Sequence, residues 1–238
     1  MKKFAVFDID GTIFRSSLFI EIVYELARRS LIELPKTEHH EAYTSWADRK
    51  DQGYASYINK MVEVIESQLR GIKVSDFEAA SDAVLEARAE RVYVYSRKLI
   101  QQLKSQDYFL IALSGSQSQL VARFAEHWGF DASVGQTYFA EDGLFTGKIN
   151  KTHYGKEKLL QPLIEKHNLS FEDSLAMGDT EGDISMLGMV QRPIAFNPNR
   201  ELYKHSVKNG WEIIVERKDM IYKFGPGSSR NYELIDTE

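Results

Sequence analysis

Residues 4–12 read Phe-Ala-Val-Phe-Asp-Ile-Asp-Gly-Thr, and this stretch decides the fold. The apolar run at 4–7 predicts a buried strand, which delivers Asp8 and Asp10 where it breaks at Gly11. Because residues two apart in a strand face the same side, both carboxylates are expected to leave the sheet edge together. Such a pair suits a cation, a nucleophile with its acid/base partner, or both. Taken alone, the pattern also fits a solvated corner between strand and turn.

The composition narrows the class of protein. A length of 238 residues suffices for one large domain or for a core domain with an insert. The apolar share of 43% and the charged share of 27% are ordinary for a soluble globular protein. A net charge of −5 without a basic block argues against a nucleic-acid surface. The chain contains no cysteine, which excludes disulfides, thiolate zinc sites and a cysteine nucleophile.

The sequence carries no pattern for export or membrane insertion. The apolar run before Asp8 is far too short for the core of a signal peptide. No apolar stretch approaches the length that spans a bilayer. We therefore expect a cytoplasmic protein.

Short apolar runs of strand character recur along the chain, at 4–7, 109–113, 174–177, 193–196 and 211–215. Helical patterns separate several of them, at 97–106, 119–127 and 156–167. This alternation indicates βαβ units and a parallel sheet covered on both faces. A hairpin is expected over 136–149, with its turn at 141–143. Residues 225–238, which carry Gly, Pro and Ser, are expected to form a flexible tail.

Residues 15–94 differ, because they contain no convincing strand. Apolar residues follow helical spacing in two places: Phe19, Ile22, Val23 and Leu26, then Tyr57, Met61, Val64 and Ile65. Ser75 and Glu78 predict a capping box at the start of a third helix. His39 and His40 are expected in a polar surface loop between helices. The sequence thus predicts an all-helical insert at 15–94 within an α/β core formed by 1–14 and 95–224.

Ser114-Gly115-Ser116 follows the apolar run at 109–113 and precedes a helical pattern. In α/β proteins, functional groups gather at the carboxyl ends of the strands. A hydroxyl and free backbone N–H groups at a helix start form a cradle for phosphate. Alternatively, Ser116 only caps the helix that follows.

Gly178-Asp179-Thr180-Glu181-Gly182-Asp183 follows the run at 174–177. Clustered carboxylates repel one another unless a cation or a proton offsets their charge. With Asp8, the acids Asp179 and Asp183 form a set of hard oxygen ligands of the kind that Mg²⁺ accepts. Alternatively, Asp183 only complements the dipole of a helix N-terminus.

A lysine is also expected near this edge of the sheet. Lys156 opens the helix that leads to Asp179, Lys158 is two residues further on, and Lys151 lies just upstream. A lone lysine at such a place is most often solvated. Spacing alone does not separate the three candidates.

Taken in order, Asp-Ile-Asp-Gly-Thr, Leu-Ser-Gly-Ser, a lysine at a helix start and Gly-Asp-Thr-Glu-Gly-Asp resemble the haloacid dehalogenase (HAD) superfamily. The helical insert after the first motif resembles the C1 cap of its phosphoserine-phosphatase-like subfamily IB. The resemblance covers residues 1–220. It implies an α/β fold, with a Rossmann-like doubly wound parallel sheet and an all-helical C1 cap inserted after the first strand.

The resemblance also implies a role for each motif residue. Asp8 is expected to attack phosphorus and form an aspartyl-phosphate, and Asp10 to protonate the leaving alcohol and then deprotonate water. Ser114 and Gly115 are expected to hold the phosphoryl oxygens, and Lys156 to neutralise their charge. Mg²⁺ is expected to be held by Asp8, Asp179 and the backbone carbonyl of Asp10, with Asp183 as a direct or water-mediated ligand.

Two positions depart from the subfamily pattern. Gly182 stands where an Asn precedes the last acid, and Ser17 stands where a Glu binds the substrate ammonium group. The departure at Ser17 argues against phosphoserine as the substrate, and Arg15 is either a substrate contact or a solvated hinge residue. The expected activity is hydrolysis of a small phosphorylated metabolite. A phosphotransferase of the same fold and a non-catalytic phosphometabolite-binding protein are the alternatives.

Overall fold

The computed structural model describes residues 1–50, 53–150, 155–227 and 232–238. The strands are β1 (Lys2–Asp8), β2 (Phe109–Gln117), β3 (Ala132–Glu141), β4 (Leu144–Asn150), β5 (Leu169–Gly178), β6 (Arg192–Phe196), β7 (Glu212–Arg217), β8 (Met220–Pro226) and β9 (Tyr232–Thr237). The helices are α1 (Leu18–Arg28), α2 (Lys36–Ala47), α3 (Gly53–Gln68), α4 (Val74–Arg88), α5 (Val94–Ser105), α6 (Ser118–His127), α7 (Lys156–Lys166), the 3₁₀ turn η1 (Glu181–Asp183), α8 (Ile184–Leu187) and α9 (Arg200–Asn209). Each predicted apolar run lies in a strand, except that Trp211 of the run at 211–215 precedes β7.

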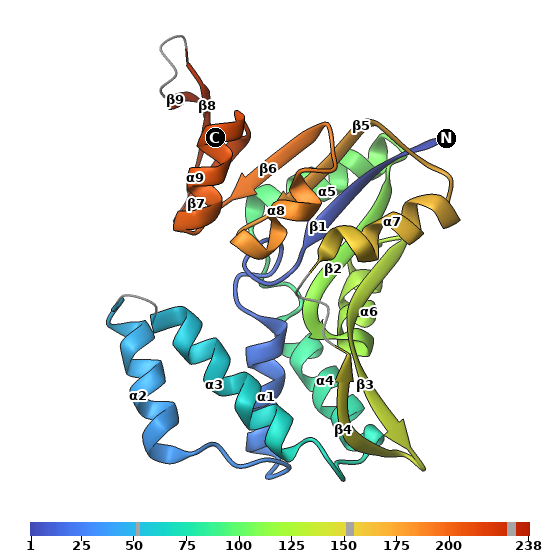
Figure 1. The fold of residues 1–238 in the computed structure, drawn as a ribbon, viewed down its shortest axis with the longest axis vertical. Coiled ribbons are helices and arrows are strands. Elements are labelled where there is room, and N and C mark those ends of the chain that lie inside the picture. The colour runs from blue at the N-terminus through green and yellow to red at the C-terminus, as the bar shows by residue number, and fades with distance from the viewer. Residues whose placement is uncertain (51–52, 151–154, 228–231) are drawn as a thin grey trace.

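The strands form one sheet in the order β4-β3-β2-β1-β5-β6-β7-β8-β9 (Figure 1). Neighbours from β3 to β7 are parallel, whereas β4 at one side and β8 and β9 at the other pair antiparallel. From β1 the chain proceeds outward in one direction through β2 and β3, then in the other through β5, β6 and β7. The carboxyl end of β1 therefore lies at the topological switch point, where α/β proteins bind ligands. The predicted doubly wound sheet is confirmed.

Both faces of the sheet are covered. Ala5 and Phe7 of β1 belong to an apolar cluster with residues of α5 and α6. Phe4 and Val6 belong to a second cluster with residues of α7, α8 and α9. A strand that is buried on both faces needs apolar residues at every position, and this explains the continuous run at 4–7.

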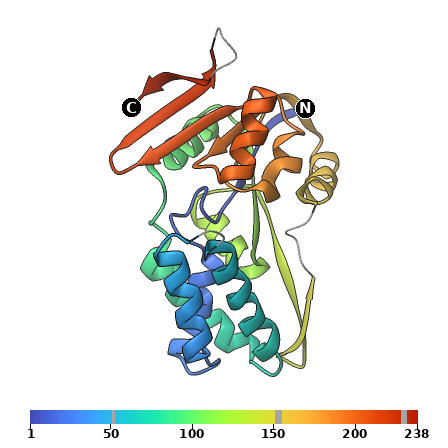
Figure 2. The same cartoon turned by 60° about the vertical axis from the view of Figure 1, so that its left-hand side comes forward.

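Helices α1 to α4 lie between β1 and α5 in the chain, and gather beyond one end of the sheet (Figures 1 and 2). Helix α1 begins after Ser17, whose Oγ accepts a hydrogen bond from the Ile20 N–H at 3.4 Å. The residues of the two predicted apolar stripes are buried: Phe19, Ile22, Val23, Leu26, Tyr57, Met61, Val64 and Ile65. The predicted helical character of this insert is therefore confirmed, while its domain boundaries stay a prediction. Within the described residues, no helix combines the length and the apolar character needed to cross a bilayer.

The predicted capping box at Ser75 and Glu78 is wrong. Helix α4 begins at Val74, with Lys73 at the N-cap and no side-chain hydrogen bond there. The Val74 N–H donates to the carbonyl of Gly143 at 2.9 Å. Pairing with a distant turn, rather than a local side chain, therefore sets the start of this helix.

The expected polar loop around His39 and His40 is also wrong, since both residues belong to α2. His39 is half-buried, and its Nε2 lies 2.9 Å from the hydroxyl oxygen of Tyr24. Helix α2 packs on α3 through aromatic rings, with Trp46 stacked on Tyr57 at a centroid distance of 5.2 Å. A polar helix held by a few aromatic contacts lacks the apolar period that makes other helices recognisable.

The predicted hairpin with its turn at 141–143 is confirmed by β3 and β4. It extends from the sheet and runs beside α4 (Figure 1). The ring of Phe77 in α4 makes edge contacts with Tyr138 and Phe145, at centroid distances of 5.9 and 5.4 Å. The hairpin therefore packs against the helical insert, which the sequence did not predict.

The prediction of a flexible tail over 225–238 is wrong for residues 232–237. These residues form β9, which pairs antiparallel with β8. Ile221 and Glu238 exchange backbone hydrogen bonds at 2.9 and 3.0 Å, and the Tyr232 hydroxyl donates to the Trp211 carbonyl at 2.6 Å. Gly225 and Pro226, which commonly interrupt regular structure, lie at the end of β8. They end this strand, but regular structure resumes in β9.

Candidate active site

Asp8 is the last residue of β1 and lies buried at the carboxyl edge of the sheet. Its Oδ1 accepts a hydrogen bond from Lys156 Nζ at 2.6 Å. Its Oδ2 is also buried and has no hydrogen-bond partner among the described residues. Burial raises the pKa of Asp8 to about 7, although the charge of Lys156 opposes this effect. A buried carboxylate oxygen without a partner is costly unless a cation, a proton or a ligand meets it.

Asp10 lies in the turn that follows β1. The sequence predicted that Asp8 and Asp10 share one face of a strand, but only Asp8 belongs to the strand. Its Oδ1 accepts a hydrogen bond from the Leu18 N–H at 2.5 Å. Its Oδ2 accepts from the hydroxyls of Ser114 and Ser116, at 2.7 and 2.9 Å. Burial raises the pKa of Asp10, while these hydrogen bonds oppose the shift. Asp10 thus links the turn after β1 to the end of β2 and to the first turn of α1.

The end of β2 differs from the expected phosphate cradle. Strand β2 continues past Gly115 to Gln117, and α6 begins only at Ser118. The Gln117 side chain accepts hydrogen bonds from the backbone N–H groups of Gln119 and Leu120, at 2.9 and 3.0 Å. These helix-start amides are therefore engaged. Gly115 itself lines the cavity described below.

Ser116 is a site residue that the sequence interpretation missed. The helix-cap interpretation of Ser116 is wrong, because Gln117 caps α6 while the Ser116 hydroxyl donates to Asp10. The spacing of the two serines in the sequence could have indicated this role. Ser114 and Ser116 are two residues apart, so a strand that continued through them would place both hydroxyls on one face.

Lys156 is the first residue of α7, and its ammonium group is buried between two acids. Its Nζ lies 2.6 Å from Asp8 Oδ1 and 2.5 Å from Asp183 Oδ1. Burial alone would lower the pKa of Lys156, but Asp183 and Asp8 outweigh it and raise the pKa. Lys158 is exposed, and Lys151 lies outside the described residues.

Replacing this lysine is expected to destabilise the fold. In Lys156→Met, the free energy of unfolding should fall by about 3–5 kcal/mol at a pH where the acids are ionised, because removal of one partner leaves buried charges uncompensated. Lys158→Met, two residues away on the exposed face, is the matched control and should change stability by less than about 0.5 kcal/mol. Urea unfolding without added metal measures both. Equal losses in the two variants would contradict the assigned contacts.

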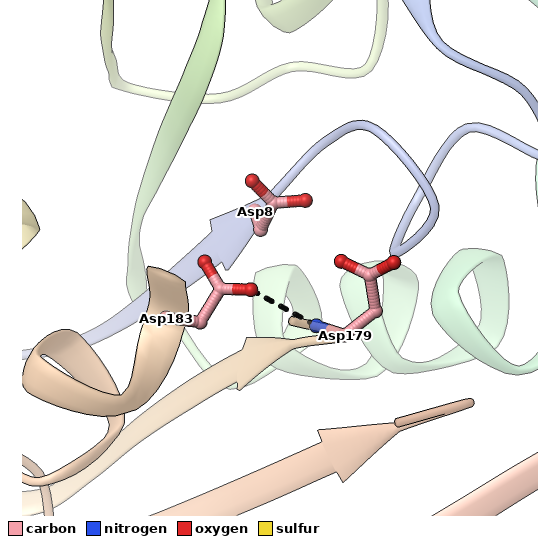
Figure 3. Close-up of side chains that lie close together, drawn as sticks. All are labelled: Asp8, Asp179 and Asp183. Atoms are coloured by element: carbon pink, nitrogen blue, oxygen red, sulfur yellow. Dashed lines mark hydrogen bonds between the residues drawn. The ribbon is translucent and has the colours of Figure 1, made fainter. Parts of the chain in front are cut away.

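Asp179 directly follows β5 and Asp183 is the last residue of η1, and both lie close to Asp8 (Figure 3). Asp183 is buried, and its Oδ2 accepts hydrogen bonds from the N–H groups of Asp179 and Thr180, at 3.1 and 3.0 Å. Its other oxygen, Oδ1, contacts Lys156. One oxygen of Asp183 therefore caps the turn that starts η1, and the other contacts Lys156. The role of Asp183 as a metal ligand stays a prediction.

The three acids form a set of donors that fits a hard divalent cation. One carboxylate oxygen from each of Asp8, Asp179 and Asp183 lies within 4.8 Å of the others (Figure 3). Burial, and next the charge of Asp8, raise the pKa of Asp179 well above its ordinary value. Oxygen ligands of this kind are preferred by Mg²⁺, and Asp8 Oδ2 needs a partner. The Asp10 side chain lies outside this group.

Gly11 allows the turn after β1 to approach Asp179. Its φ is +88°, and a Cβ atom added there would lie 2.2 Å from Asp179 Oδ2. Glycine adopts this φ without strain, whereas any Cβ there would also require the Asp179 carboxylate to move. Gly11 is therefore favoured for two reasons: the left-handed backbone of the turn, and the close approach of the Asp179 carboxylate.

Gly11→Ala is expected to lower the free energy of unfolding by about 3 kcal/mol, because it adds a steric clash to the cost of a left-handed backbone. Gly71→Ala is the matched control. Gly71 has a φ of +85° and nothing within 4 Å of an added Cβ. It should therefore lose only about 1–2 kcal/mol. Equal losses in urea unfolding of the two variants would contradict the close contact with Asp179.

A cavity of about 520 Å³ opens from the carboxylates between the sheet edge and the helical insert. Asp8, Asp10, Lys156 and Asp179 line one end of it. Both positions that depart from the subfamily pattern, Ser17 and Gly182, line it as well. Arg15 is not among its described lining residues; its guanidinium lies over the ring of Tyr93, at 5.6 Å from the centroid.

Comparison with known proteins identifies the family. The sequence profile of the haloacid dehalogenase-like hydrolases matches residues 5–188. The chain is 24% identical over 222 residues to a phosphoserine phosphatase of Methanocaldococcus jannaschii, covering 92% of this chain and 94% of the relative. It is 26% identical over 226 residues to a phosphoserine phosphatase of Wolinella succinogenes, covering 92% and 96%.

A solved structure shows the same fold. A protein of unknown function from Bordetella pertussis Tohama I aligns with a TM-score of 0.71 at 20% identity, covering 90% of this chain and 98% of that chain. Because the family profile matches most of the sequence, the chain belongs to the haloacid dehalogenase-like hydrolases. The expectation of an enzyme of this family is therefore confirmed.

Proposed function

We propose that this protein is a Mg²⁺-dependent phosphomonoester hydrolase that acts on a small phosphorylated metabolite through an aspartyl-phosphate. The observation that carries the proposal is the buried Asp8 oxygen, which has no hydrogen-bond partner in the described part of the chain and lies beside Lys156 and two further acids. Family membership and the names of the phosphoserine phosphatase relatives support the reaction class.

Each residue of the site has a role in this reaction. An oxygen of Asp8 attacks phosphorus, and the bond from phosphorus to the leaving oxygen breaks as Asp10 gives that oxygen a proton. Water then attacks phosphorus, Asp10 accepts its proton, and Asp8 is released. Lys156 orients Asp8 through its hydrogen bond at 2.6 Å and offsets the negative charge. Mg²⁺ held by Asp8, Asp179 and Asp183 would supply further charge neutralisation.

Asp10 is suited to carry the proton. Its raised pKa favours the protonated form, which a general acid requires. Hydrogen bonds from Leu18, Ser114 and Ser116 fix the orientation of the carboxyl group. These contacts give the two β2 serines a positioning role, and Ser114 with Gly115 remains our proposal for contact with the phosphoryl oxygens.

The helical insert, residues 15–94, acts in this proposal as a cap over the leaving group. One wall of the cavity comes from α1 and α3, and the opposite end holds the catalytic acids. A cap of this kind excludes water while the phosphoryl group moves, and it selects the alcohol.

Release of inorganic phosphate from a panel of phosphate monoesters, with Mg²⁺ present, tests the proposal. We expect release from at least one ester by the wild type and none above background by Asp8→Asn. Transfer of the phosphoryl group to an added alcohol in preference to water would favour the phosphotransferase instead. Ligand binding without phosphate release across the panel would contradict the hydrolase.

A further inference from the structure

Beyond the catalytic end, the cavity has an apolar wall. The apolar and aromatic residues that line it come from α1, α3, β3 and β4: Phe19, Ile58, Val62, Ile65, Tyr138 and Ile149. The other polar lining side chains of the insert and hairpin include Asn59 and Glu66 of α3 and Gln136 of β3. Tyr54, also of α3, lies near the acids at the catalytic end. The part of a substrate that lies beyond the phosphoryl group would therefore contact mostly hydrocarbon.

Helix α3 contributes apolar side chains both to the core of the insert and to the cavity wall. Tyr57, Met61 and Val64 are buried in the core of the insert. Ile58 and Val62 each follow a core residue by one position, so they lie about 100° further around the helix and face the cavity. Both are only half-buried. Both side chains pack against the core of the insert and still leave part of their apolar surface toward the cavity, as residues of a binding surface do.

The charges around the cavity argue against an acidic leaving group. Among the described residues, Lys156 is the only cationic side chain that lines it, and Lys156 contacts Asp8 and Asp183. A carboxylate buried against Ile58 and Val62 would lose its hydration without gaining a cation.

The volume of the cavity indicates the size of the group that it takes. An apolar cavity of about 150 Å³ binds benzene. The cavity here measures about 520 Å³, so it accommodates a phosphoryl group together with a hydrocarbon larger than a benzene ring. A leaving group with two or three carbons would leave much of the apolar wall in contact with water.

We infer that the substrate is the phosphate monoester of an uncharged, largely apolar alcohol of aryl or branched-alkyl size. This inference rests on the proposed function and specifies its substrate class. The phosphoryl group lies at Asp8, and the hydrocarbon lies against Ile58 and Val62 of α3. The residue at position 62 therefore determines specificity.

Three matched esters test the substrate class: propyl phosphate, 3-phenylpropyl phosphate, and the phosphate ester of 3-hydroxypropanoate. The second adds an apolar ring to the first, and the third has a carboxylate in place of the terminal methyl group of the first. We expect kcat/KM for the phenylpropyl ester to exceed that for the propyl ester by about 10- to 100-fold, since the ring is buried in the cavity. The carboxylate ester should be the poorest substrate.

A pair of cap variants tests the position of the hydrocarbon. Val62→Lys places a cation in the cavity, so kcat/KM for the phenylpropyl ester relative to the carboxylate ester should fall at least about tenfold. Ser56→Lys adds the same charge on α3 at an exposed position outside the cavity lining, and it should leave this ratio unchanged. Val62→Thr, a smaller change, should lower kcat/KM for the phenylpropyl ester only. The Val62→Thr variant therefore tests the inference even if Val62→Lys does not fold.

The outcomes separate the inference from the proposed function. If the carboxylate ester is hydrolysed as well as the phenylpropyl ester, or if Val62→Lys and Ser56→Lys behave alike, the inferred substrate class is wrong and the hydrolase stands. If no ester, whatever its leaving group, releases phosphate with Mg²⁺ present, both are wrong. A preference for the phenylpropyl ester that Val62→Lys removes supports the inference.

Discussion

Asp8→Asn is expected to lower the rate of phosphate release by a factor of about 10⁴ or more, since it removes the nucleophile of a covalent mechanism. The amide has the shape of the carboxylate but lacks its charge. Asp183 still pairs with Lys156, so the buried lysine keeps a partner in the variant. The fold should therefore persist, and a thermal unfolding profile close to that of the wild type would show that the loss is chemical.

The control for this variant is Asp142→Asn, which makes the same change at an exposed position in the turn between β3 and β4. Asp142 has a φ of 49°, a conformation that asparagine also tolerates. This variant should keep the wild-type rate. If Asp8→Asn retained more than about one per cent of the wild-type rate, a nucleophilic role for Asp8 would be excluded.

Removal of divalent cations is expected to have the second largest effect. After treatment with EDTA, phosphate release should fall by about 100-fold or more, and Mg²⁺ should restore it, because three clustered acids need a cation to bind an anionic phosphate. Mg²⁺ should also stabilise the fold without substrate, by about 2.7 kcal/mol at a concentration 100 times its Kd. Thermal unfolding with and without Mg²⁺ measures this second effect.

Asp179→Asn provides the control for the cation effect. It removes one charge from the acid cluster and leaves Asp8 and Lys156 in place. The stabilisation by Mg²⁺ should be largely lost in this variant. Full activity after thorough chelation, or an unchanged Mg²⁺ effect in Asp179→Asn, would show that the acids do not hold a catalytic cation.

The sequence predicted the sheet well because its central strands are buried on both faces. Phe4 to Phe7 must all be apolar, and such a run is visible without knowledge of the fold. Parallel strands bring their carboxyl ends to one edge, and this explains why Asp8, Asp10, Ser114 and Asp179 come together. The motif positions therefore follow from topology.

Features that depend on contacts between distant segments were not predictable in the same way. Helix α2 is polar and is held by rings such as Trp46 on Tyr57. Strand β9 is stabilised by pairing with β8 and by the Tyr232 hydroxyl. Lys156 and Lys158 have similar sequence positions, but two residues rotate a helix by about 200°, so only one of them faces the acids.

The central claim is that Asp8 carries the phosphoryl group during turnover. The most direct measurement is mass spectrometry of the wild-type enzyme, quenched in acid during turnover of a substrate and digested into peptides. A phosphoryl group should appear on Asp8, be released by hydroxylamine, and be absent from Asp8→Asn. Turnover with no phosphoryl group on the protein, or with the group on another residue, would contradict this mechanism.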